Sequence, residues 1–214
     1  MVKTVFKILV ALVSTGIWLG SLSIPAQSAT AELSDADRAA LARVETYLNG
    51  IQSLRARFLQ VAPDGSLSQG RFFLKRPGRL RFEYDPPTPL LVITDGVWVV
   101  FYDKEIDQVS RVPLASTPLA VLVRETVDLS QDIHIDRVQR AADGITITIS
   151  DPEQPDIGSI ILFFADEPLR LKRWWLKDAQ GQETAIVIHD AESNVTLKPE
   201  LFFFFDTDQQ DQNN

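Results

Sequence analysis

The 214-residue sequence has no cysteine and only two histidines, and these shortages exclude several kinds of chemistry. Without cysteine there is no disulfide framework, no catalytic thiolate and no thiolate metal site. His134 and His189 stand alone inside strand-like runs, with neither a nucleophile-elbow serine nor a spaced set of metal ligands beside them. A glycine-rich phosphate loop is also missing, since Gly65, Gly70 and Gly78 fall near turns between strands. Nothing in the sequence therefore requires an enzyme, a metal or a cofactor.

The sequence has one long apolar run, near its N-terminus, and its pattern is typical of a secretory signal peptide. Two lysines precede the uncharged apolar stretch 8–22, and small residues follow it. The small residues predict cleavage after Ala31, with cleavage after Ser28 as the alternative. The run is shorter than a comfortable membrane span. We therefore expect residues 1–31 to be a cleaved signal peptide, a retained signal anchor being the alternative, and residues 32–214 to form a single soluble domain.

Acidic residues outnumber basic ones, and the formal net charge is −8 at pH 7. Loss of the segment 1–31, which holds two lysines and no acid, would make the exported chain still more acidic. Such a protein should avoid nucleic acid and anionic membranes and should be attracted to a basic partner surface. Bacterial lipoproteins carry their lipid on a cysteine next to the signal cleavage site, so this chain cannot be lipidated in that way.

The exported part predicts one amphipathic helix followed by many short strands. Ser34 and Asp37 resemble a capping box, apolar residues recur at helical spacing from Leu41 to Ile51, and Asn49-Gly50 predicts the helix end. A second, short helix is expected after Pro118. Strands are expected at 54–59, 70–75, 79–84, 90–94, 97–102, 107–112, 133–138, 144–150, 159–164, 171–177 and 184–189, with a last strand-like segment at 202–205. This pattern favours one α+β domain whose antiparallel sheet curls into an open or closed barrel.

Four strand-like runs are apolar at every position instead of alternating, namely 72–74, 97–101, 160–164 and 201–205. A sheet with one face in water has alternating apolar and polar residues. These runs therefore indicate that either protein covers both faces or one face lines a dry cavity. Two short helices are few to cover about ten strands, which makes part of the inner face a candidate ligand surface. An ordinary sandwich core fits the composition equally well.

The segment 70–84, GRFFLKRPGRLRFEY, resembles the LolA family of outer-membrane lipoprotein carriers. The hairpin strands 91–96 and 98–102, the F-x-Q segment at 58–60, and Pro118 in a short T-P helix agree with the same family. The resemblance extends over essentially the whole exported chain. It implies a strongly curved antiparallel sheet that forms an incomplete β-barrel, with short helices as a lid over its open mouth.

The resemblance also implies a periplasmic chaperone that binds the acyl chains of lipoproteins in a hydrophobic cavity and catalyses no reaction. It would take its cargo from an inner-membrane ABC-type lipoprotein release complex and pass it to an outer-membrane lipoprotein receptor, as a monomer without cofactor. Exposing acyl chains to water costs about 0.8 kcal/mol per CH₂, so a lipoprotein cannot cross the aqueous gap alone. The alternatives are a LolA-like periplasmic sensor or binding protein for another lipid, an enzyme acting on lipid or glycan, and an envelope protein whose apolar strands are only core.

In this family the arginine of the K-R-P turn, here Arg76, is associated with lid closure and transfer. Arginine suits the bonding of lid carbonyls because it presents five donors in a rigid fork, and the alternative is an exposed turn arginine. Arg79 and Arg81 make the third strand more basic than the family pattern, and the segment after Phe205, a region associated with cargo retention in the family, is short. The candidate cavity residues, each of which could equally be plain core, are Leu80, Phe82, Phe72, Leu74, Val92, Trp98, Val100 and Leu122.

Overall fold

The structure, a computed structural model, describes residues 33–204 except 131–132, 152–153 and 155–156. The expected signal peptide therefore lies outside the described residues. Within the described part of the chain, no helix is long and apolar enough to cross a membrane.

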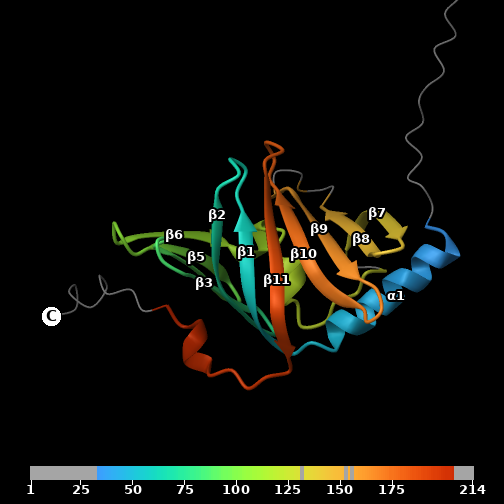
Figure 1. Ribbon diagram of the computed structural model, residues 1–214, viewed down its shortest axis with the longest axis horizontal. Helices are drawn as coiled ribbons and strands as arrows, with labels where there is room; N and C mark the ends of the chain where they lie inside the picture. Colours follow the sequence, from blue (N-terminus) through green and yellow to red (C-terminus); the bar gives the residue numbers. More distant parts are fainter. Residues whose placement is uncertain (1–32, 131–132, 152–153, 155–156, 205–214) are drawn as a thin grey trace, which may run out of the picture. The chain divides into compact units, whose positions relative to one another are not determined.

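Eleven antiparallel strands form one sheet in the order β6-β5-β4-β3-β2-β1-β11-β10-β9-β8-β7 (Figure 1). Every strand expected from the sequence between residues 54 and 189 is present. Among the described residues the ladder begins at β6 and ends at β7, with no pairing between these two edges. The strands are β1 (Ser53–Val61), β2 (Leu67–Lys75), β3 (Arg79–Tyr84), β4 (Leu90–Asp95), β5 (Trp98–Asp103), β6 (Gln108–Pro113), β7 (His134–Ala141), β8 (Gly144–Ser150), β9 (Ser159–Ala165), β10 (Arg170–Lys177) and β11 (Glu183–Ser193).

Aromatic contacts across the inner face measure how strongly this sheet curves. The Trp174 ring on β10 lies 5.6 Å from the Phe72 ring on β2 and 6.3 Å from the Phe82 ring on β3, centroid to centroid. Two strands, β11 and β1, separate β10 from β2 in the sheet. Neighbouring strands are about 4.8 Å apart, so these rings could not meet above a flat sheet. The contacts confirm the predicted α+β fold with a strongly curved sheet that forms an incomplete barrel.

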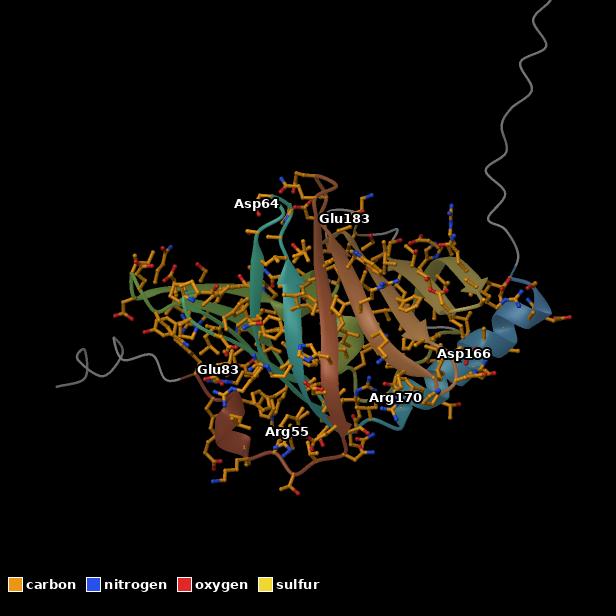
Figure 2. The ribbon with its side chains drawn as sticks, viewed as in Figure 1. Arg55, Asp64, Glu83, Asp166, Arg170 and Glu183 are labelled. Carbon is orange, nitrogen blue, oxygen red and sulfur yellow. The ribbon has the colours of Figure 1, made fainter. Side chains whose placement is uncertain are left out.

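The helix α1 (Asp35–Asn49) begins with the predicted capping box. The Ser34 hydroxyl accepts from the Asp37 backbone N–H at 3.1 Å, and the Ser34 N–H donates to the Asp37 carboxylate at 3.2 Å. The Tyr47 ring lies 5.9 Å from the Phe164 ring on β9. Arg43 forms an ion pair with Asp166 in the β9–β10 turn, which Figure 2 shows beside the helix. The helix is therefore held against the β7–β10 side of the sheet.

The second helical segment comprises a 3₁₀ turn, η1 (Leu114–Ser116), and the four-residue helix α2 (Ala120–Val123), close to where the sequence predicts a short helix. Val121, Leu122 and Val123 are all buried in the cluster that also contains the inner-face residues of the sheet. This short segment therefore covers part of the inner face.

The C-terminal prediction was wrong, because residues 199–202 form a 3₁₀ helix, η3 (Pro199–Phe202), instead of a strand. The segment 194–204, called the strap below, crosses the outer face of the sheet (Figure 1). Phe202 and Leu197 of the strap form a buried cluster with Phe73 of β2. The Leu201 carbonyl accepts from Arg81 on β3 at 3.1 Å. The apolar run at the C-terminus thus packs onto the sheet and does not extend it.

Candidate functional site

Six of the eight candidate cavity residues come together on the inner face. They share one buried cluster and comprise Phe72, Leu74, Leu80, Phe82, Val92 and Leu122. The strand register explains why, because Phe72 is opposite Phe82, Phe82 is opposite Val92, and Leu74 is opposite Leu80. Leu122 reaches the same cluster from α2.

The other two candidates, Trp98 and Val100, lie on the outer face, which corrects their assignment to the cavity. Val100 is opposite Ile93, and Ile93 is opposite Arg81, an outer-face residue that bonds the strap. Between them Val99, which is completely buried, points inward, whereas 42% of the Trp98 surface is exposed. The run 97–101 is apolar at every position, so alternation could not tell which set of residues faces inward.

Arg76 lies in the β2–β3 turn and is buried, with only 7% of its surface exposed. Its Nη2 donates to the carbonyl oxygen of Leu122 on α2 at 3.2 Å. Two residues later, the Gly78 N–H donates to the Val123 carbonyl at 2.8 Å. Removal from water lowers the pKa of the Arg76 guanidinium, because burial disfavours the charged form. The β2–β3 turn is therefore tied to the end of α2, and Arg76 is not an exposed turn arginine.

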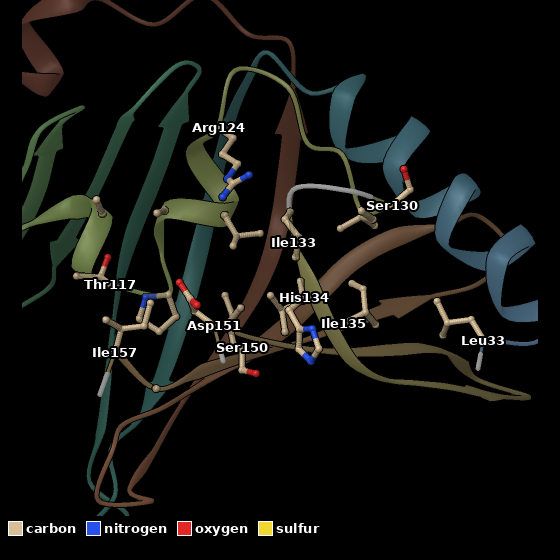
Figure 3. A pocket seen from close by; sticks show the side chains of 18 residues that line it. Leu33, Thr117, Arg124, Ser130, Ile133, His134, Ile135, Ser150, Asp151 and Ile157 are labelled. Carbon is tan, nitrogen blue, oxygen red and sulfur yellow. The ribbon is translucent and has the colours of Figure 1, made fainter. Parts of the chain in front are cut away.

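A cavity of about 720 Å³ lies beside α2, toward strands β7, β8 and β9 (Figure 3). Its apolar wall includes Val121 of α2, Leu129, and three isoleucines of the sheet region, Ile133, Ile149 and Ile160. Arg124, His134 and Asp151 also line it, and Figure 3 shows Arg124 next to α2. The volume falls in the range of about 300–1,000 Å³ that small-molecule sites usually have.

None of the eight candidate residues lines this cavity, so the sequence reasoning located the aromatic floor under α2 and missed the hollow next to it. The available signal was the alternation of Ile145, Ile147 and Ile149 on β8, which marks one apolar face. The path of the segment 124–133 could not be predicted, because its sequence has no clear helical or strand period. In the structure Val127 in this segment is fixed by two hydrogen bonds with the Asn49 side chain, of 2.8 and 2.9 Å.

A cluster of His134, Asp136 and Ser150 at the cavity rim does not have the arrangement of a hydrolase. The Asp136 carboxylate accepts from Ser150 Oγ at 2.8 Å and lies 3.4 Å from His134 Nε2. The carboxylate therefore lies between hydroxyl and imidazole, whereas a Ser-His-Asp site needs the imidazole in the middle. Among the described residues no group of three or more His, Cys, Asp or Glu side chains could hold a metal ion.

Comparison with known proteins gives a consistent result over most of the chain. Residues 49–205 match the family described as outer membrane lipoprotein carrier protein LolA. The outer-membrane lipoprotein carrier protein of Chromohalobacter salexigens is 30% identical over 195 residues, which are 86% of this chain and 91% of the relative. That of Pseudomonas aeruginosa is 29% identical over 197 residues, or 88% and 92% of the two chains. A crystal structure of a LolA superfamily protein from Nitrosomonas europaea aligns with a TM-score of 0.43 at 11% identity, covering 77% of this chain and 97% of that one.

Proposed function

We propose a carrier function for this chain, which belongs to the LolA family of outer membrane lipoprotein carrier proteins. The acyl chains of a lipoprotein are held on the inner face beneath α2, and the loaded carrier moves through the periplasm from the inner to the outer membrane. The observation that carries this proposal is the hydrogen bond from buried Arg76 to Leu122, which ties α2 down over an apolar interior.

The contacts around α2 fit a lid that opens. A four-residue helix has too few internal hydrogen bonds to be stable alone, so its position depends on packing and on the ties from Arg76 and Gly78. When α2 moves away, Val121, Leu122 and Val123 leave the inner cluster, and acyl chains can take their place against Phe72 and the other floor residues. The cavity beside α2 supplies space into which such chains extend.

The partners follow from the same proposal. An inner-membrane ABC-type release complex loads the carrier and an outer-membrane receptor unloads it, with the carrier acting as a monomer and using no cofactor. The net charge of −8 supports contact with basic partner surfaces over anionic membranes. An enzyme acting on lipid is less well supported, because in the Ser150–Asp136–His134 arrangement the carboxylate, and not the imidazole, lies next to the hydroxyl.

The test is native mass spectrometry of the exported chain mixed with a triacylated lipoprotein, with Arg76→Leu compared to wild type. A one-to-one soluble complex is expected. A hydrogen bond to a charged group contributes about 1.5–3 kcal/mol, partly offset here by the burial of the guanidinium, so losing it should slow cargo release about tenfold. The Arg76–Leu122 hydrogen bond forms only when the lid is closed, and the lid is open in the loaded state. Loss of this bond destabilises the closed, empty state and therefore favours the loaded one.

Arg79→Leu is the matched control, since Arg79 begins β3 three residues later and sits opposite Lys75. It should release cargo at the wild-type rate. A wild-type protein that fails to keep the lipoprotein soluble contradicts the carrier function. Equal release from the two variants contradicts only the role of Arg76.

A further inference from the structure

Among the described residues Trp174 is the largest completely buried side chain, and its polar atom has no partner there. None of its surface is exposed, and its indole Nε1 finds no acceptor in the described part of the chain. A buried Trp N–H usually has a hydrogen-bond partner, because leaving such a donor unpaired is unfavourable. The surroundings are aromatic, with the Phe72 and Phe82 rings as neighbours.

This donor lies on the inner face, in the same buried cluster as the α2 residues Val121, Leu122 and Val123. The strand register places Trp174 between Leu162 on β9 and Ile186 on β11, and both are buried in the same inner cluster. Its ring extends across the concave side to β2 and β3, where the candidate floor residues lie. The indole therefore belongs to the surface against which acyl chains pack in the proposed function.

An indole N–H can only donate, so the group that satisfies it must be an acceptor. The floor is otherwise apolar, which favours a neutral acceptor over a carboxylate, because burying an unpaired charge is far more costly. Acyl chains attached through esters carry such an acceptor at the head of each chain. A phenylalanine at this position would line the floor without adding a polar atom, as Phe72 and Phe82 do.

We propose that Trp174 Nε1 donates a hydrogen bond to an ester carbonyl of the bound acyl groups and so fixes how far the chains enter the interior. This inference rests on the proposed carrier function and adds a specific polar contact to it. It makes the protein selective for ester-linked over ether-linked chains of the same length, because an ether lacks the carbonyl.

The experiment measures, by calorimetry, the binding of a short-chain diacylglyceryl-cysteine peptide and of its diether analogue. Wild type should bind the diester about five- to tenfold more tightly, which is the effect expected for one hydrogen bond to a buried donor. Trp174→Phe removes the N–H and keeps an aromatic ring, so it should bind both peptides equally. Trp175→Phe is the matched control, because Trp175 is next in β10 and stacks on Arg173, whose guanidinium carbon lies 5.2 Å from its ring. This control should keep the preference.

A second measurement needs no variant. The indole N–H resonance of Trp174 in the wild-type NMR spectrum should move downfield with the diester and not with the diether. An unmoved resonance with the diester bound, or equal affinities of wild type for the two peptides, overturns the inference and leaves the carrier function intact. If wild type binds neither peptide, the carrier function itself fails. The same calorimetry with a short-chain diester phosphocholine and its diether analogue tests whether phospholipid carbonyls also accept this hydrogen bond. A tighter binding of the diester that Trp174→Phe abolishes supports the same contact.

Discussion

The two halves of the sheet use their apolar residues differently on the outer face. In the half made of β1–β6, Phe73 on the outer face is buried under Leu197 and Phe202 of the strap. In the half made of β7–β11, Phe163 on the outer face is only partly buried. Its ring instead carries the guanidinium of Arg173, with 4.2 Å from Cζ to the ring centroid. A chain segment covers Phe73 in one half, whereas in the other half Arg173 stacks on both Phe163 and Trp175 and leaves Phe163 partly exposed.

The inner faces differ as well. In the β1–β6 half aromatic rings fill the concave side, with Phe58 and Phe72 each in contact with Phe82 at 5.0 and 4.8 Å between centroids. In the β7–β11 half Phe164 and Trp174 are also buried on the inner face, but the aliphatic side chains Ile149 and Ile160 line the 720 Å³ cavity beside α2. Runs that are apolar on both faces therefore have different outer-face neighbours in the two halves, the strap in one and the Arg173 guanidinium in the other, while part of the inner face of the β7–β11 half lines a hollow.

Phe73→Ala and Phe163→Ala make the sharpest test of the outer-face difference, because the same side chain is removed from the same face in each half. Phe73→Ala should lower the free energy of unfolding by about 3–5 kcal/mol, since a buried ring is lost and the strap loses its contact. Phe163→Ala should cost about 1–2 kcal/mol, because water already reaches that ring. Urea denaturation measures both. Equal losses of unfolding free energy in the two variants would show that the strap does not stabilise Phe73 by burying it.

Ala120→Leu and Ala56→Leu test the inner-face difference in the opposite direction, by adding volume. Ala56 on β1 is buried opposite Phe72, where a larger side chain should cost about 1–3 kcal/mol. Ala120 lines the cavity, so Ala120→Leu should change the free energy of unfolding by less than about 0.5 kcal/mol. The same variant should weaken lipid binding in calorimetry, since it occupies cavity volume. A large destabilisation by Ala120→Leu would mean that the cavity has no room for the added side chain, contrary to its volume of about 720 Å³.

How much the sequence could predict depended on whether a strand had a polar face. Leu80 and Phe82 alternate with charged residues, and this pattern assigned both to the inner face correctly. Trp98 and Val100 belong to a run without polar residues, so only the register in the folded sheet could reveal their side. Phe202 belongs to another run without polar residues, and this pattern favoured a strand. Its contact with Phe73 could not be predicted, because Phe73 is far away in the sequence.

The cavity could not be predicted, because it depends on how segments without secondary structure are positioned. The sequence 124–133 has no period that indicates its path, and long-range hydrogen bonds position its described part, such as that from the Leu129 N–H to the Glu45 carboxylate. Arg76 was identified through its resemblance to the family turn, but its burial and its bond to Leu122 are properties of the folded chain.

The smallest expected effects come from two carboxylates with lowered pKa values, Asp37 beside the β7–β11 half and Asp64 in the β1–β2 turn of the other half. The hydrogen bond from Ser34 and then that from Arg140 lower the pKa of Asp37 below its ordinary value of 3.8. Arg140 belongs to β7, so this carboxylate joins α1 to the hollow half, with 2.9 Å from Arg140 Nε to its oxygen. Because the pKa is lowered in the folded state, the contribution of Asp37 is complete above pH 3.8 and is lost as pH falls through the folded pKa below it.

Asp37→Asn should therefore flatten the fall in unfolding free energy that urea denaturation records as pH is lowered from about 4 to about 2. Asp64, at the tip of the β1–β2 turn in Figure 2, provides the comparison, because hydrogen bonds from Ser66 lower its pKa as well. That carboxylate binds only its own turn, with the Ser66 N–H at 2.9 Å. Asp64→Asn should flatten the fall to a similar extent without changing lipid binding, whereas Asp37→Asn should also loosen the contact of α1 with β7, next to the cavity-lining residue Leu33, and weaken binding. Identical binding in the two variants would contradict a role for the α1–β7 tie in shaping the hollow half.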